Sequence, residues 1–231
     1  MLMEIKDLDV GYGKRVVVDG LSMTVEEKET VAIIGHNGAG KTTTLKGIFG
    51  LIKPSKGEIL YNGINIAGRA PVNNIQDGIT FLPQDRFIFP ELNVSENLYL
   101  GAYTAKEDVH SSLEIIYNLF PVLKERSWQR SSTLSGGERR MLGIGMTLIT
   151  RPRLLILDEP SLGLAPVLVK SLFESFIQIR EELGTSVILV EQNVKQAMEI
   201  AHRVYVMKMG RKILEETGAN LLEREDWWDL F

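Results

Sequence analysis

The amino-acid sequence predicts an α/β fold built on a mixed, mainly parallel β-sheet. Short apolar runs alternate with amphipathic stretches along the chain, which is typical of a parallel sheet covered by helices. The runs 31–34, 154–157 and 187–190 are continuously apolar, as strands buried on both faces are. Residues Pro166–Leu183 carry their apolar side chains on one helical face, so we expect this segment to cover the sheet.

The N-terminal third is expected to form a separate antiparallel β patch. Residues 2–9, 21–25 and 57–62 have the pattern of strands joined by glycine-containing turns. Residues from about 94 to 149 are mostly helical in pattern, which indicates a helical lobe inserted into the α/β core. The predicted organisation is a single domain, 1–231, with a core lobe of about 1–88 and 150–231 and a helical lobe of about 89–149.

The composition narrows the class of protein. The 231 residues are 44% hydrophobic, which is enough for a substantial core, and cysteine is absent, which excludes disulfides and thiolate metal sites. A net charge of −4 argues against a nucleic-acid binder, which usually has a basic excess. We see no signal peptide, and the apolar runs hold about four residues where a bilayer span needs about 20. The expectation is a cytoplasmic protein that reaches a membrane through a partner.

The segment 35–42 has the spacing of a phosphate-binding loop, G-x-x-x-x-G-K-[ST]. It follows the apolar run 31–34 and precedes a helix-like run, 42–49, as such a loop should. Its glycines let backbone N–H groups turn toward a phosphate, and the helix start adds a positive dipole end. We expect Lys41 to bridge the β- and γ-phosphates and Thr42 to hold Mg²⁺. The predicted nucleotide-binding residues of this segment are Gly35, His36, Asn37, Gly38, Ala39, Gly40, Lys41, Thr42 and Thr43.

Two adjacent carboxylates, Asp158 and Glu159, follow the apolar run 154–157. Successive strand side chains point to opposite faces, so the two groups can serve different atoms. We expect Asp158 in the outer shell of Mg²⁺ and Glu159 beside the attacking water, which it polarises or orients. The alternative is an acidic helix cap beyond a core strand, and the phosphate loop weighs against it.

A Leu-Ser-Gly-Gly-Glu sequence at 134–138 precedes an amphipathic stretch of about 139–149. A serine and two glycines at a helix start offer N–H groups, a hydroxyl and a dipole to an anion. This turn comes after the phosphate loop and just before the carboxylate pair. In that order, from about residue 3 to 215, the chain resembles the ATP-binding subunits of ABC transporters. The resemblance implies the ABC ATPase fold with its P-loop NTPase core, and an ATPase that uses ATP and Mg²⁺.

The resemblance also implies roles for residues outside the phosphate loop. Tyr12 matches the aromatic residue that stacks on adenine, and Gln84 matches the glutamine that contacts Mg²⁺ and reports to a transmembrane partner. The loop 161–164 takes the place of one that crosses a dimer interface. Each has an alternative: a core aromatic for Tyr12, a surface amide for Gln84 and a helix cap for Ser161. The residues matching the element that caps the γ-phosphate on the opposite subunit are Ser135, Gly136 and Gly137.

One position departs from the family. After the strand expected at 186–191 the family usually has a histidine that touches the γ-phosphate, and this chain has Gln192. An amide can donate one hydrogen bond but cannot carry charge or shuttle a proton near neutral pH. The predicted catalytic role of Gln192 is therefore sensing only, and the chemistry moves to Glu159. The predicted catalytic residues are Glu159, Gln192 and Lys41, and the predicted metal ligands are Thr42, Gln84 and Asp158.

The resemblance implies several protein partners. A second ATP-binding subunit, identical or similar, would complete the ATP site, and two transmembrane permease subunits would dock near 84–97 at the inner face of the cell membrane. An apolar contact at 87–90 is the candidate surface, and a self-packed loop is the alternative. A solute-binding protein takes part indirectly, and no nucleic acid is expected. Trp227 and Trp228 either mark a partner contact or fold back onto the domain.

Details within the family favour one kind of importer. The sequences at 161–166, 190–193 and 141–145 look like those of ATPases of branched-chain amino acid importers. Close relatives of these serve urea or short amides, so that solute class is the first alternative. A soluble ABC-type protein acting on ribosomes or DNA is the second, although no fused second half, long coiled coil or basic arm is present. A regulator that binds without hydrolysis and a GTPase are both disfavoured.

Overall fold

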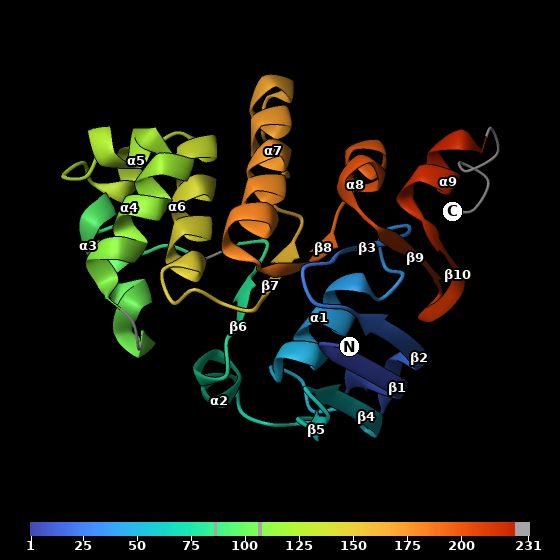
Figure 1. Cartoon of the computed structure of the whole chain (residues 1–231). Helices are drawn as coiled ribbons and strands as arrows, with labels where there is room; N and C mark the ends of the chain where they lie inside the picture. The colour runs from blue at the N-terminus through green and yellow to red at the C-terminus, as the bar shows by residue number, and fades with distance from the viewer. Residues whose placement is uncertain (86, 106–107, 225–231) are drawn as a thin grey trace.

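The computed structural model describes residues 1–85, 87–105 and 108–224 (Figure 1). Within them the chain forms a six-stranded sheet in the order β10-β9-β3-β8-β7-β6 and a four-stranded sheet in the order β2-β1-β4-β5. Trp227 and Trp228 lie outside the described residues. The strands are β1 (Met3–Tyr12), β2 (Arg15–Val25), β3 (Thr30–Ile34), β4 (Lys56–Tyr61), β5 (Ile64–Asn65), β6 (Ile79–Leu82), β7 (Leu154–Asp158), β8 (Ser186–Val190), β9 (Arg203–Lys208) and β10 (Arg211–Thr217).

The six-stranded sheet is mixed but mainly parallel, which confirms the predicted fold class. Strands β9, β3, β8, β7 and β6 are parallel, and β10 pairs antiparallel with β9 at the edge. Every residue of β3, β7 and β8 is buried, which explains their continuous apolar runs. Because parallel strands end at the same edge of a sheet, the loops that follow these strands meet there.

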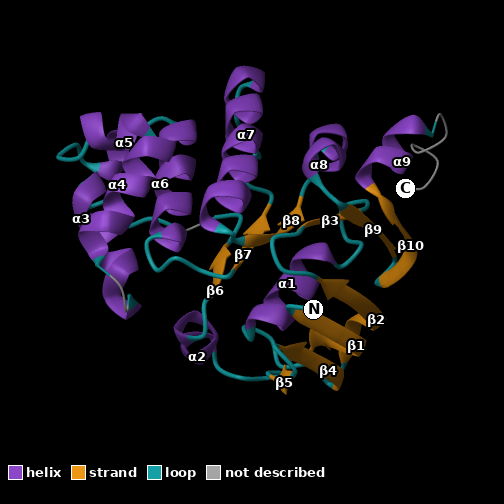
Figure 2. Ribbon diagram, in the orientation of Figure 1, coloured by secondary structure: helices purple, strands orange, loops and turns teal. Residues whose placement is uncertain are grey.

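Helices cover both faces of this sheet (Figure 2). The strand side chains alternate between two hydrophobic clusters. Leu155 joins the cluster of α7 (Pro166–Leu183) and α8 (Val194–Ile200), while Ile156 joins that of α1 (Lys41–Phe49) and the four-stranded sheet. The other helices are α2 (Pro71–Gln76), α3 (Val94–Gly101), α4 (Val109–Leu119), α5 (Pro121–Glu125), α6 (Gly136–Leu148) and α9 (Gly218–Glu223), with short 3₁₀ turns at Ala102–Thr104 and Ser131–Thr133.

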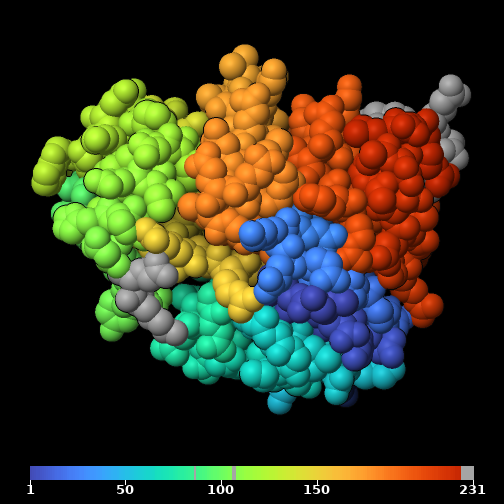
Figure 3. Space-filling model, viewed as in Figure 1, coloured from blue at the N-terminus to red at the C-terminus, as the bar shows by residue number. Residues whose placement is uncertain are grey.

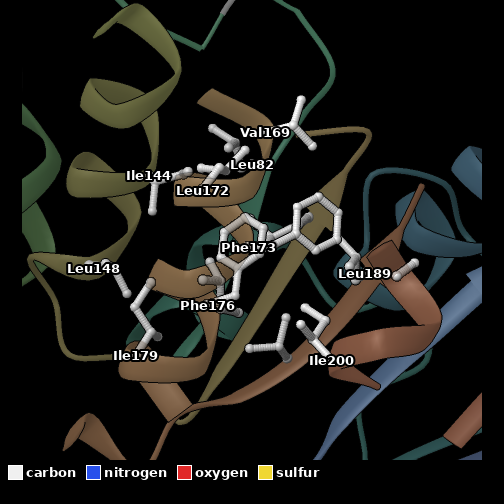
Figure 4. Packing of buried hydrophobic residues seen from close by; sticks show 14 of the residues in the cluster. Leu82, Ile144, Leu148, Val169, Leu172, Phe173, Phe176, Ile179, Leu189 and Ile200 are labelled. Atoms are coloured by element: carbon white, nitrogen blue, oxygen red, sulfur yellow. The ribbon is translucent and has the colours of Figure 1, made fainter. Parts of the chain in front are cut away.

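Helices α3 to α6 gather beside α7 at one end of the six-stranded sheet (Figure 1). In Figure 4, Ile144 and Leu148 of α6 point toward Leu172 and Ile179 of α7, and all four belong to one cluster that continues into the sheet. The helical segment therefore has no separate core of its own. No helix in the described ranges combines the length and the apolar character that crossing a bilayer would require.

The antiparallel patch is also confirmed. Strand β1 pairs antiparallel with β2 and with β4, and β4 pairs with β5. Strand β2 begins at Arg15, well before the predicted start at 21. Its first half is largely exposed and contains Gly20 at φ +65°, so it lacks the apolar alternation from which a strand is predicted.

Candidate functional site

The phosphate loop, residues 35–40, connects β3 with α1. Gly35, Gly38 and Gly40 adopt φ angles of +152°, +82° and +101°, which other residues rarely adopt. At Gly35 an added Cβ would also lie 2.2 Å from the carbonyl oxygen of Met207, so only glycine fits there. In this described segment no side chain caps the N-terminus of α1, which leaves the first N–H groups of the helix available to an anion.

Lys41 is the first residue of α1, and its side chain folds back over the loop. Its Nζ donates hydrogen bonds to the carbonyl oxygens of Gly35 at 2.7 Å and His36 at 3.1 Å. Burial lowers the pKa of Lys41 from its ordinary value, and the nearby carboxylates of Glu159 and Asp158 oppose that shift. A phosphate entering the loop would therefore meet a positive charge that is already in place but bonded to neutral carbonyls.

Asp158 lies at the end of β7, directly behind the loop. The Thr42 hydroxyl donates to its Oδ1 at 3.0 Å, which ties α1 to β7. Burial raises the pKa of Asp158, and the hydrogen bond from Thr42 lowers it in part. A hydroxyl and a carboxylate side by side are the oxygen donors that Mg²⁺ prefers, so these residues fit the metal site that the sequence predicts.

Glu159 follows immediately, with a left-handed backbone at φ +49° that turns the chain out of β7. Its N–H donates to the carbonyl oxygen of Val190 at 2.8 Å. Its Oε2 accepts from the side-chain amide of Gln84 at 2.9 Å and from that of Gln192 at 2.8 Å. Two amides from loops after β6 and β8 therefore fix the direction of this carboxylate, and the structure joins three residues that the sequence predicted separately.

These groups surround a cavity of about 300 Å³. Its lining is Val17, Asn37, Gly38, Gly40, Lys41, Thr42, Thr43, Gln84, Glu159 and Gln192. Gly35, His36 and Ala39 shape the loop without lining the cavity, and Asp158 lies behind Thr42. Val17 was not predicted from the sequence, where it reads as one of three consecutive valines in β2.

Tyr12 lies at the end of β1 with 53% of its surface exposed, and it does not line the cavity. The alternative of a core aromatic is therefore wrong. An exposed ring is available for stacking on a base, and this role stays a prediction.

The Ser-Gly-Gly turn begins α6 but takes no part in this cavity. The helix starts at Gly136 and not at 139 as predicted, because Ser135 and Glu138 form a capping box: the Glu138 N–H donates to Ser135 Oγ at 3.3 Å and the Ser135 N–H donates to Glu138 Oε2 at 2.7 Å. Ser135 and Gly136 are exposed, whereas Gly137 is buried. The first two residues of this turn are thus exposed on the surface, at a helix start that its own side chains cap.

Arg140, on α6, connects that helix to the loop of Gln84. Its guanidinium donates to the carbonyl oxygen of Gln84 at 3.2 Å and lies 4.4 Å from the centre of the Phe87 ring. Burial lowers its pKa, and the carboxylates of Glu191, Asp158 and Glu159 oppose this. In the sequence Arg140 looks like an ordinary helix surface charge, so its burial could not be predicted.

The fold and this cavity define a nucleotide-binding protein of the α/β class with a phosphate loop. A sequence profile described as "ABC transporter" matches residues 18–162. The chain therefore belongs to the ABC transporter family and corresponds to its ATP-binding domain, as the resemblance implied.

Individual relatives agree with this assignment. The chain is 43% identical over 212 residues to the high-affinity branched-chain amino acid transport ATP-binding protein BraG of Pseudomonas aeruginosa, covering 91% of each chain. It is 36% identical to the probable branched-chain amino acid transport ATP-binding protein LivF of Archaeoglobus fulgidus, over 97% of this chain and 95% of that one. Among solved structures, cbiO1 from Clostridium perfringens, part of the ABC transporter complex cbiONQ, superposes with a TM-score of 0.84 at 26% identity, covering 98% and 92% of the two chains.

Asp158→Asn should stabilise the nucleotide-free protein while abolishing Mg²⁺-dependent ATP hydrolysis. Because burial raises the pKa of Asp158, the folded state binds this proton more tightly than the unfolded chain, so the ionised carboxylate costs stability at neutral pH. An amide oxygen can still accept from Thr42. We expect about 1 kcal/mol of added stability at pH 7.5, or roughly 2–4 °C in Tm.

Thermal melting at several pH values checks this. The advantage of the variant should shrink as the pH falls through the raised pKa of Asp158, since the wild type then gains the missing proton. Asp85→Asn is the matched control, because Asp85 is exposed, and its Tm should move by about 1 °C or less. A lower Tm for Asp158→Asn at pH 7.5 would contradict the account.

Proposed function

We propose that this chain is the ATP-hydrolysing subunit of an ABC importer, a cytoplasmic protein bound peripherally to the inner face of the cell membrane. The observation that carries the proposal is the carboxylate of Glu159, which two amides hold at the cavity that the phosphate loop also lines. Hydrolysis of a terminal phosphate needs a base or water-orienting group beside the phosphate loop, and a carboxylate there can act on the attacking water. Glu159 is the general base or water-orienting group in this proposal.

The other side chains have separate tasks. Lys41 would leave the carbonyls of Gly35 and His36 and bind the β- and γ-phosphates, which are stronger acceptors. Gln192 would hold Glu159 in place and sense the phosphate, since its amide cannot accept a proton from water. Phosphoryl transfer depends mainly on positioning and charge stabilisation, and these contacts supply both.

Mg²⁺ would be held by Thr42, Asp158 and Gln84. No group of three or more His, Asp or Glu side chains that could hold a metal occurs among the residues described. A divalent ion here would therefore depend on phosphate oxygens of the nucleotide, which is how Mg²⁺ binds in many ATPases. When bound, it would neutralise charge on the phosphates.

A closed ATP site would need a second subunit. The cavity lining holds no residue of the Ser-Gly-Gly turn, Ser135 to Gly137, which begins a helix and is exposed at its first two residues. We infer that this turn covers the γ-phosphate of ATP bound to a partner chain, identical or similar. The family resemblance and the exposed helix start both support this arrangement.

The helical segment would be the part that meets the permeases. We propose a single domain in which 89–149 is the helical lobe and the rest is the core lobe.

An apolar hollow of about 380 Å³ lies between strand β6 and helices α3 and α6, lined among others by Phe87, Leu100, Tyr103 and Met146. Tyr103 is almost fully exposed, and Phe89 is half exposed. Such a surface suits a short apolar helix of a permease subunit. Figure 3 shows the green helical segment forming one end of the molecule.

Branched-chain amino acids are the proposed solutes. BraG and LivF are named for the transport of these amino acids, and they match nearly the whole chain. Import of urea or short amides is the alternative. A role on ribosomes or DNA is less well supported, because both relatives are named as transport proteins.

Glu159→Gln should retain ATP binding and slow turnover by about 10²–10⁴-fold, the usual contribution of a general base. The amide keeps the shape of the carboxylate, and its oxygen can take the place of Oε2 and accept from both Gln84 and Gln192. Binding of a fluorescent ATP analogue and steady-state phosphate release measure the two effects. Glu199→Gln, at an exposed position of α8, is the control and should behave as the wild type. Near-normal hydrolysis by Glu159→Gln would refute the assignment.

The solute is tested with the transporter assembled in membranes. Vesicles that contain this chain with its permease pair and solute-binding protein should accumulate radiolabelled leucine when ATP is supplied, and vesicles with Glu159→Gln should not. Accumulation of urea or acetamide without leucine would favour the alternative importer. Recovery of the chain with ribosomes and not with membranes would contradict import altogether.

A further inference from the structure

Glu191 is a buried carboxylate beside the site, outside the cavity lining. It follows β8 directly, and only 1% of its surface is exposed. Its Oε1 accepts from the Ser161 N–H at 2.8 Å. Its Oε2 accepts from the Ser161 hydroxyl at 2.8 Å, the Gln192 N–H at 3.0 Å and the Asn193 N–H at 3.2 Å.

These four donors are neutral, and the carboxylate forms no salt bridge with any residue in the described ranges. Burial raises the pKa of Glu191, and the hydrogen bonds from Ser161, Asn193 and Gln192 oppose the shift. Asn193 extends the contact, since its side-chain amide donates to Ser161 Oγ at 2.6 Å. Burying a carboxylate without a salt bridge costs free energy even when its oxygens are hydrogen-bonded. That the chain keeps this group is consistent with a role in the site.

The contacts close a ring around Glu159. From Glu159 the chain runs through Pro160 to Ser161, which donates to Glu191. From Glu191 the peptide bond leads to Gln192, whose side-chain amide donates back to Glu159 Oε2 at 2.8 Å. The carboxylate of Glu191 therefore accepts hydrogen bonds from both Ser161 and Gln192, the two residues that complete this ring.

We propose that Glu191 is a positioning residue for hydrolysis: it holds the Ser161 loop and Gln192 in the arrangement that aims Glu159. This rests on the proposed function of Glu159. The same bonds fix the start of the 161–164 loop, so that movement of this loop against a partner subunit would reach Gln192 and Glu159. Glu191 does not line the cavity, so nucleotide affinity should not depend on it.

Glu191→Gln is the first test. The amide NH₂ would face N–H and O–H donors, so at least one contact with Ser161 or Gln192 must break. We expect kcat to fall about 10- to 100-fold, the range for a misplacement of about 1 Å, while KM for ATP and the affinity for a fluorescent ADP analogue stay within about threefold. Glu199→Gln is the control for the charge change.

Ser161→Ala removes one hydrogen bond of the same ring and should fold normally, since it deletes a single hydroxyl. It removes the hydroxyl that Glu191 and Asn193 share, and kcat should fall about 3- to 10-fold with KM unchanged. Ser175→Ala is the control, because Ser175 is a buried serine of α7 whose hydroxyl donates to the Leu172 carbonyl oxygen. In the double variant, Glu191→Gln should cost less in kcat than it does alone, because both changes open one ring.

The outcomes separate this inference from the proposed function. If the wild type and Glu199→Gln both lack ATPase activity, the proposed function fails. If both are active and Glu191→Gln keeps kcat within about twofold, or if kcat falls in proportion to nucleotide affinity, Glu191 is not a positioning residue. Losses in Ser161→Ala and Glu191→Gln that simply multiply would also overturn the inference.

Discussion

The hydrogen bond from the Thr42 hydroxyl to the Asp158 carboxylate joins two segments that are 116 positions apart in the chain, and the site is built around it. It forms because β3 and β7 are parallel strands of one sheet, separated by β8, and end at the same edge. The phosphate loop supplies positive charge and N–H groups at that edge, and the loops after β7 and β8 supply carboxylates. This edge of the sheet therefore brings groups of opposite charge together, which suits the binding of a nucleotide phosphate and, in our proposal, of Mg²⁺.

The position of Glu159 depends on the same edge of the six-stranded sheet. Its left-handed backbone ends β7, and the amides of Gln84 and Gln192 reach it from loops after the neighbouring strands β6 and β8. Glu191 adds the contact that connects the loop after β7, at Ser161, with the loop after β8, at Gln192. The carboxylate of Glu159 is thus oriented by neutral donors, which can hold its direction without neutralising its charge.

Much of the fold could be predicted because burial on both faces leaves a continuous apolar run, as in β3, β7 and β8. Strands β9 and β10 were not predicted. In β10 exposed residues alternate with half-buried ones, so its apolar alternation is weak. The signal for the β9–β10 hairpin is only the tight turn at Met209 and Gly210. The motif residues of the site were found because they are adjacent in sequence. Glu191 and Arg140 were missed, because tertiary contacts bury them and a sequence does not show burial.

In the proposed ATP site, the loop of Lys41 from one chain and the turn of Ser135 from another hold the terminal phosphate of ATP. The most direct test is the mass of Glu159→Gln by analytical ultracentrifugation, with and without ATP. We expect ATP to convert monomers into dimers. Adding Ser135→Arg should abolish the conversion, and adding Ser132→Arg, at an exposed position nearby, should not. ATP-saturated Glu159→Gln that stays monomeric at every concentration, or dimers that form equally well with Ser135→Arg, would contradict it.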